Sequence, residues 1–327
     1  MRNRRRTNTG TGIMYRGFAS SMSYGRLPSI LVVSALLFSA VTSLNAEDSY
    51  LIINSDANVQ KYKAVQQAFI ESVDARTTEL DLASTKPERA TSLIRSTNPS
   101  LIYCIGSKAY LTIKDATKSR KVVVSSAINW QRFRLGKQTF GVANELNTGM
   151  QLTMFKYFFP EIKTIGVIYS KTYNRQWLSK AKDSAKDVGI EIEARSVRRA
   201  KDVGKALDKI LPKVDALWLI TDPVALGDAA SIETIFRIAD SRRKPIFTYS
   251  AAFVTDKFSP AMVISPDIPT IGRQAAGLAD EVMADEEIEE KFQDPAGSAI
   301  TLNMKVVEKY KLKLNEDALD SVNQLIK

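Results

Sequence analysis

Short apolar runs that alternate with helical patterns are the feature that most constrains how this chain can fold. The runs are rich in Val, Ile, Leu and Tyr, and they cover 50–53, 101–105, 122–124, 164–169, 190–194, 216–221, 245–249 and 261–264. They do not alternate strictly between apolar and polar residues. Continuous apolar runs of this length are typical of strands buried on both faces, as in parallel sheets.

The segments between the runs carry apolar residues at helical spacing. Five such stripes fall within 59–73, 146–158, 177–188, 232–239 and 271–283. Regular alternation of strands and helices predicts α/β layers with parallel sheets and right-handed crossovers. Eight strands are enough to close a barrel. The polar stretch at 129–139 and the loss of the strand–helix rhythm after Tyr249 favour two smaller sheets instead.

The residue types that are missing exclude much chemistry. The 327 residues contain no His and one Cys. A Ser-His-Asp triad, a His-ligated zinc, an intramolecular disulfide and a multi-cysteine metal site are therefore impossible. The sequence also has no G-x-S-x-G elbow, no P-loop and no clustered carboxylate motif. We expect no enzyme activity, no cofactor and no metal site, and we expect Cys104 to be a buried core residue.

The first 46 residues have the character of an export signal. They hold six Arg and no acid, then an apolar run at 27–41, then small and polar residues up to Ala46. That order predicts a signal peptide over 1–46 and an exported, periplasmic protein; an uncleaved membrane anchor is the alternative. With its only Cys at 104, the chain cannot be a lipoprotein. Without this segment 40 basic and 36 acidic residues remain, a net charge of +4, so no nucleic-acid partner is expected.

The motifs NPSLIYCIGS at 98–107, TIGVIYS at 164–170 and VDALWLITD at 214–222 are met in this order along the chain. Together with further motifs, they resemble the ABC-transporter substrate-binding family that includes tryptophan-binding members. The further motifs lie at 140–142, 188–192, 244–249, 271–275, 299–303 and 310–314. Each motif is a strand with a turn, so the resemblance depends on their order and spacing over about 98–314.

The resemblance implies a type I periplasmic-binding fold, with two Rossmann-like parallel-sheet lobes around a central cleft. The chain would cross between the lobes near Ala143, Ser250 and Ser298. The first lobe would then contain 47–142 plus about 250–297, and the second 143–249 plus about 298–327. The resemblance also implies a small-molecule ligand, ABC permease subunits as partners, and a monomer that captures its ligand by lobe closure.

Polar residues that follow the strands are the candidate ligand-binding residues, because open parallel sheets bind ligands beyond the carboxyl ends of their strands. They are Ser55, Gly106, Ser107, Asn129, Ser170, Tyr173, Asn174, Thr221, Asp222, Tyr249 and Ser250. Most of them are also ordinary turn and helix-cap residues, which is the alternative for each one.

The candidate residues suggest an amino-acid-like ligand. Asp222 is expected to pair with a ligand ammonium, and the helix N-terminus at Ser107 favours a carboxylate. Tyr173, Tyr249 and Trp130 offer aromatic faces for stacking, although Trp130 also fits a residue that covers a core edge. Two other functions stay open: a ligand sensor that docks on a membrane receptor, and a secreted α/β enzyme that works without His.

Overall fold

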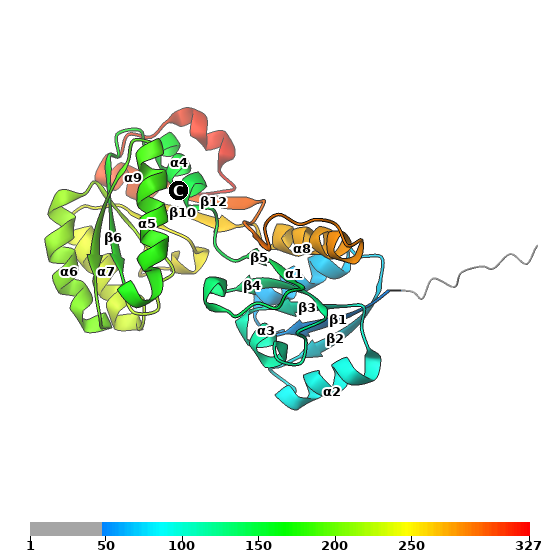
Figure 1. Ribbon diagram of the computed structural model, residues 1–327. Coiled ribbons are helices and arrows are strands. Elements are labelled where there is room, and N and C mark those ends of the chain that lie inside the picture. Colours follow the sequence, from blue (N-terminus) through cyan, green and yellow to red (C-terminus); the bar gives the residue numbers. More distant parts are fainter. Residues whose placement is uncertain (1–47) are drawn as a thin grey trace, which may run out of the picture. The chain divides into compact units, whose positions relative to one another are not determined.

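The structure is a computed structural model that describes residues 48–327, so the predicted signal peptide lies outside the described residues. The described chain forms two α/β lobes, each built on its own sheet (Figure 1). The predicted fold class of two parallel-sheet lobes is confirmed.

The first lobe contains a six-stranded sheet in the order β11-β5-β4-β3-β1-β2. All its strand pairs are parallel. The strands are β1 (Ser49–Asn54), β2 (Arg76–Asp81), β3 (Leu101–Ile105), β4 (Lys121–Ala127), β5 (Thr139–Ala143) and β11 (Phe292–Gln293). The carboxyl ends of β1, β3, β4 and β5 therefore lie along one edge of this sheet.

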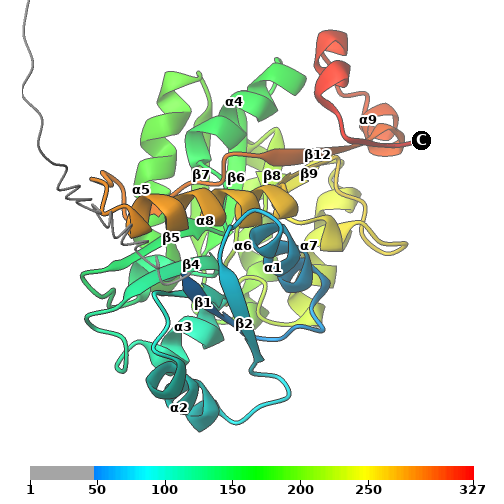
Figure 2. The same ribbon diagram turned by 90° about the vertical axis from the view of Figure 1, so that its right-hand side faces the viewer.

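Helices cover both faces of the first sheet. On one face, α1 (Gln60–Ile70) packs beside α8 (Ile268–Met283), as Figure 2 shows. On the other face lie α2 (Pro87–Thr97) and α3 (Ser107–Ile113). Consecutive residues of β1 belong to opposite cores, since Ile52 packs with the α1/α8 side and Ile53 with the α2/α3 side. This explains why the strands read as continuous apolar runs, and Cys104 is buried as predicted.

The second lobe contains a seven-stranded sheet in the order β13-β12-β10-β9-β8-β6-β7. Its strands are β6 (Thr164–Tyr169), β7 (Glu191–Ser196), β8 (Ala216–Trp218), β9 (Ile246–Thr248), β10 (Met262–Pro266), β12 (Ser298–Asn303) and β13 (Gln324–Ile326). The pairs are parallel except for β10 with β12, which is antiparallel.

The helices of the second lobe also form two layers. One layer contains α4 (Thr148–Phe158), α5 (Lys171–Asp187) and α9 (Met304–Tyr310). The other contains α6 (Val203–Ile210) and α7 (Ala229–Ser241). Five short 3₁₀ turns complete the described chain: Trp130–Arg132, Ala200–Asp202, Leu211–Lys213, Ala251–Phe253 and Glu316–Ser321.

The strand order places the second crossing between lobes later than the sequence suggested. The prediction assigned about 250–297 to the first lobe, but β10 is bonded to β9 and β12 in the second sheet. The chain therefore crosses after Pro266, enters α8 and β11 of the first lobe, and returns before Ser298. The loop after β9 contains only a 3₁₀ turn at Ala251–Phe253, and it leads back into the same sheet, where β10 pairs with β9 and β12.

The sequence patterns also do not predict the edge strand β2. Its residues Arg76, Thr77, Thr78 and Glu79 are polar, and most of them are exposed. An edge strand needs few apolar residues, so β2 carries no apolar run in the sequence.

Candidate functional site

Ser55 and Gly106 hold the ends of two neighbouring strands of the first lobe together. The Ser55 hydroxyl donates to the Ile105 carbonyl at 2.7 Å and accepts from the Ala109 N–H at 2.9 Å. Gly106 has φ +84°, and a Cβ there would lie 2.6 Å from the Ser55 oxygen. This close approach explains a glycine between β3 and α3. The contacts serve the fold and use the hydrogen-bonding capacity of Ser55.

Ser107 and Asn129 lie on the same side of the first lobe. The Ser107 hydroxyl accepts from the Ile128 N–H at 3.0 Å, which ties the start of α3 to the loop after β4. Asn129 has φ +54°, and its backbone N–H donates to the carboxylate of Glu145. Trp130 stacks on Phe292 with ring centroids 4.2 Å apart, so it covers a core edge.

In the second lobe, Asp222 lies at the centre of a hydrogen-bond network and its side chain is buried. One carboxylate oxygen accepts from the Ser170 N–H at 2.6 Å and from the Asn174 amide at 2.8 Å. The other accepts from the N–H groups of Val224 and Ala225 at 2.9 and 2.8 Å. Four protein donors occupy a carboxylate that offers about four acceptor positions. This geometry favours a structural role for Asp222 and does not support the expected pairing with a ligand ammonium.

Asn174 completes that network. Its amide also donates to the Thr221 carbonyl at 3.1 Å, and its backbone departs from helical angles inside α5, with φ −122° and ψ 18°. The network thereby joins the carboxyl ends of β6 and β8 with the first turn of α5. The structure brings Ser170, Asn174, Thr221 and Asp222 together through contacts within the protein.

Tyr173 links the two lobes. The Arg132 guanidinium lies 4.6 Å from the centroid of the Tyr173 ring, in cation–π geometry. Arg132 belongs to the first lobe, in the 3₁₀ turn after β4, and Tyr173 belongs to α5 of the second. The contact shows that the edges bearing the candidate residues face each other across the lobes.

Tyr249 and Ser250 follow β9. The Tyr249 phenol is hydrogen-bonded to the Thr221 side chain, and burial raises its pKa, with the charge of Glu145 adding to the shift. The Ser250 hydroxyl accepts from the Ala252 N–H at 3.3 Å and so begins the next 3₁₀ turn. Tyr249 therefore lies close to Glu145, whereas Ser250 is occupied as a local cap.

Glu145 is the site residue that the sequence did not reveal. It lies on the segment that leaves β5 of the first lobe and enters α4 of the second. Burial raises the pKa of its carboxyl to about 7, against the opposing effects of its own and the Asn129 N–H and of the Lys61 charge. Its Oε2 atom is buried and has no hydrogen-bond partner among the described residues. A buried carboxylate oxygen without a partner is costly unless something else pairs with it.

Lys61 in the first turn of α1 supplies the matching positive charge. Burial lowers the pKa of its ammonium group, and the nearby Glu145 opposes that shift. The structure thus places a partly desolvated cation and a partly desolvated anion near the point where the lobes meet. The only signal in the sequence was a single carboxylate in the otherwise uncharged stretch from 138 to 155.

The described residues 48–327 contain no group of three or more His, Cys, Asp or Glu side chains placed to hold a metal ion. Over the same range, every helix is too short or too polar to cross a bilayer. The arrangement offers paired charges, hydroxyls and aromatic faces, which suit recognition of a small polar molecule.

Two parallel-sheet lobes of this kind define the class of type I periplasmic-binding folds. The sequence pattern of the family described as ABC transporter substrate binding protein matches residues 50–326. The chain therefore belongs to this family of substrate-binding proteins, whose members bind ligands.

Individual relatives agree with this assignment. A tyrosine-binding protein of Clostridioides difficile (strain R20291) is 23% identical over 220 residues, which cover 64% of this chain and 62% of that protein. The chain thus spans less than two thirds of this curated relative.

Two solved structures share the fold. A ligand-free, open substrate-binding protein with adhesive properties from Clostridium difficile has a TM-score of 0.67 at 16% identity, covering 86% of this chain and 99% of that one. An ABC domain from Streptococcus pneumoniae in complex with L-Trp has a TM-score of 0.57 at 18% identity, covering 85% and 100%.

Proposed function

We propose that this protein binds a free amino acid between its lobes and delivers it to the permease subunits of an ABC importer. The observation that carries the proposal is the buried Glu145 Oε2 atom without a hydrogen-bond partner, close to the partly desolvated Lys61. An amino-acid zwitterion presents an ammonium to the first and a carboxylate to the second. The proposal therefore assigns the ammonium-binding role to Glu145 instead of Asp222.

The energetics of Glu145 support an ammonium as its partner. In the free protein, a pKa of about 7 means that the carboxyl is partly protonated near neutral pH. A ligand ammonium against Oε2 stabilises the ionised form and supplies the missing hydrogen bond. A neutral sugar supplies the hydrogen bond without the charge, so it gains less from this position.

The side-chain class of the ligand is proposed to be aromatic. Tyr249 lies near Glu145, and Tyr173 lies on the facing edge of the second lobe. An aromatic ring of the ligand can stack on side chains of this type. One relative is named for tyrosine and one solved relative holds L-Trp, which supports the same class.

Delivery requires that the protein change shape when the ligand binds. Contacts from both lobes to one ligand favour a closed form, and the segments between the lobes absorb the rotation. We propose that the closed form docks on the permease outside the cytoplasmic membrane, after export directed by residues 1–46. Loss of uptake of the identified ligand in cells lacking this protein would test the delivery step.

A thermal-shift screen of the purified protein tests the ligand class. The panel contains the twenty amino acids, purines, sugars and short peptides. A ligand at 100 times its Kd adds about 2.7 kcal/mol to the free energy of unfolding, which raises Tm by several degrees. We expect L-tyrosine or L-tryptophan to give the largest shift. A sugar or purine as the sole hit would overturn the amino-acid proposal, and no hit at all would overturn small-molecule binding.

The role of Glu145 is tested by changing protein and ligand together. We expect Glu145→Gln to weaken binding of L-tyrosine by about 30-fold or more in calorimetry, because a desolvated charge pair is worth about 2 kcal/mol or more. It should weaken binding of 3-(4-hydroxyphenyl)propanoate, which lacks the ammonium, far less.

Glu287→Gln is the matched control for this experiment, because it makes the same chemical change in the exposed segment after α8. It should leave both affinities unchanged. Equal losses for the two ligands in Glu145→Gln would show that Glu145 does not contact the ammonium.

A further inference from the structure

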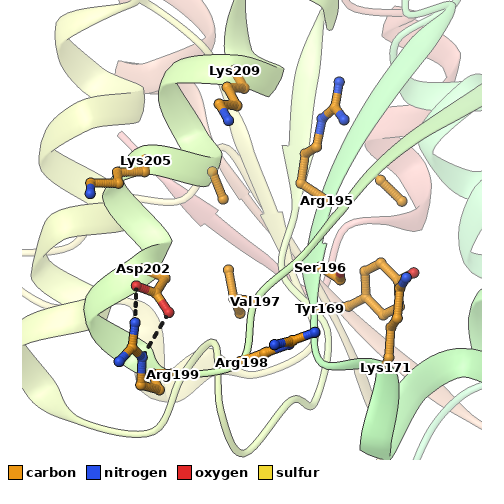
Figure 3. Close-up of a pocket in the computed structure, with 12 residues that line it drawn as sticks. Tyr169, Lys171, Arg195, Ser196, Val197, Arg198, Arg199, Asp202, Lys205 and Lys209 are labelled. Atoms are coloured by element: carbon orange, nitrogen blue, oxygen red, sulfur yellow. Dashed lines mark hydrogen bonds and ion pairs between the residues drawn. The ribbon is translucent and has the colours of Figure 1, made fainter.

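A strongly basic pocket lies in the second lobe, apart from the residues around Glu145. It has a volume of about 850 Å³ and lies between β7 and α6, next to the start of α5 (Figure 3). Six cationic side chains line it: Lys171, Arg195, Arg198, Arg199, Lys205 and Lys209. The only carboxylate in its lining is that of Asp202.

Three segments bring these cations together. Arg195 extends from β7, and Arg198 lies in the turn that follows it. Lys205 and Lys209 are one helical turn apart on α6. In Figure 3, Arg195 and Lys209 lie at one end of the pocket and Lys171 and Arg198 at the other, with Val197 between them. The cations therefore surround an open space of molecular size.

Little of this charge is neutralised locally. Asp202 is engaged by Arg199, whose guanidinium nitrogens lie 3.1 and 3.2 Å from its two oxygens. The Asp202 charge also interacts with Lys205, and the lining offers no further carboxylate to Lys171, Arg195, Arg198 and Lys209. The described residues 48–327 hold 40 basic and 35 acidic residues, a net charge of +5, and the pocket lining alone has six cations and one carboxylate. Like charges held together destabilise the free protein, and a bound anion relieves that repulsion.

Arg195 adds a second, independent observation. Its Nε atom is buried and has no hydrogen-bond partner among the described residues. Leaving a buried donor of a charged group without an acceptor costs free energy. A guanidinium matches the oxygens of a phosphate or carboxylate in bidentate geometry, so an oxyanion can supply the missing acceptor.

We propose that this pocket binds a multivalent anion that carries a phosphate group. Five cations need more negative charge than the single carboxylate of an amino acid supplies, and the volume lies within the range of small-molecule sites. The phosphate belongs either to a free phosphorylated molecule or to the headgroup of an anionic lipid. No residue is shared with the proposed amino-acid site, so the two sites are separable by mutation.

Calorimetry with inorganic pyrophosphate on the full protein tests the proposal. We expect binding that weakens as salt is added, and a Kd at least tenfold higher in the double variant Arg195→Gln/Lys209→Gln. The control is Arg89→Gln/Lys118→Gln, which removes the same charges from exposed positions of the first lobe and should leave the Kd unchanged. Both variants should fold cooperatively and keep the amino-acid response of the parent protein.

Vesicle-binding and citrate-binding experiments identify the class and source of the anion. Stronger binding to vesicles with phosphatidylglycerol than to phosphatidylcholine vesicles, displaced by pyrophosphate and lost in Arg195→Gln/Lys209→Gln, would assign a lipid headgroup. Pyrophosphate binding without vesicle binding would assign a free phosphorylated molecule. Absence of pyrophosphate binding, equal weakening in the control, or citrate binding as tight as that of pyrophosphate would overturn the proposal.

Discussion

At the scale of single residues, the Asp222 carboxylate keeps four donors in place at the ends of β6 and β8. Its contacts reach the Ser170 and Val224 backbones and the Asn174 amide, at 2.6 to 2.9 Å. With these partners, the carboxylate fixes the strand ends against the first turn of α5. Ser170 and Asn174 are therefore held in place by a carboxylate whose acceptor positions are already taken by protein donors.

We expect Asp222→Ala to lower the free energy of unfolding by about 2–4 kcal/mol, because it leaves several buried donors without acceptors. Urea unfolding measures this loss. Asp208→Ala is the control: its side chain is 62% exposed and lies 3.9 Å from Arg242, so its effect should stay within about 0.5 kcal/mol. If Asp222→Ala instead weakened ligand binding without loss of stability, Asp222 would have the ligand-binding role predicted from the sequence.

At the scale of elements, the connection from β3 to α3 depends on Gly106. Its φ of +84° and the 2.6 Å approach of the Ser55 oxygen both exclude a Cβ. We expect Gly106→Ala to lower the free energy of unfolding by about 1–3 kcal/mol through backbone strain and displacement of Ser55.

The exposed Gly277 of α8 provides a matched control, because a Cβ there meets nothing within 4 Å. Gly277→Ala should raise the free energy of unfolding by about 0.5–1 kcal/mol through helix propensity. Thermal and urea unfolding of both variants show whether Gly106→Ala lowers and Gly277→Ala raises the free energy of unfolding. A neutral Gly106→Ala would show that the strand end adapts without cost.

The elements also show which features of the fold are encoded locally. Apolar runs such as 101–105 and 164–169 could be predicted as strands because both faces of each sheet are covered. Strand β2 could not, since an exposed edge leaves no apolar signal. The membership of β10 depends on pairing with β9 and β12, which are distant in sequence from one another. Local patterns reveal strands, whereas sheet membership comes from tertiary contacts.

In the candidate site, too, some residues could be predicted from sequence patterns and others depend on tertiary contacts. Residues that follow strands, such as Ser170 and Thr221, could be placed at the correct edge from topology alone. Glu145 could not be singled out, because its importance comes from burial beside Asn129 and Lys61 in the folded protein. A turn residue and a buried carboxylate with one unpartnered oxygen look alike in the sequence.

At the scale of the whole molecule, the proposed role of Glu145 predicts that ligand binding depends on pH. Burial raises the pKa of its carboxyl to about 7 in the free protein. Because the folded state holds this proton more tightly than the unfolded state does, its contribution to stability is full below the unfolded pKa. That contribution is lost as the pH rises through about 7. A ligand ammonium acts in the opposite direction, since it binds the ionised carboxylate.

We therefore expect the Kd for L-tyrosine to be constant above about pH 7 and to rise below it, by up to about tenfold per pH unit. Small-angle scattering should show the same dependence at a fixed ligand concentration, with a smaller radius of gyration at pH 8 than at pH 5.5. In Glu145→Gln the weakened affinity should no longer change with pH, because no proton competes with the ammonium. A parent Kd that stays constant from pH 5.5 to 8 would show that ligand capture is not linked to the ionisation of Glu145.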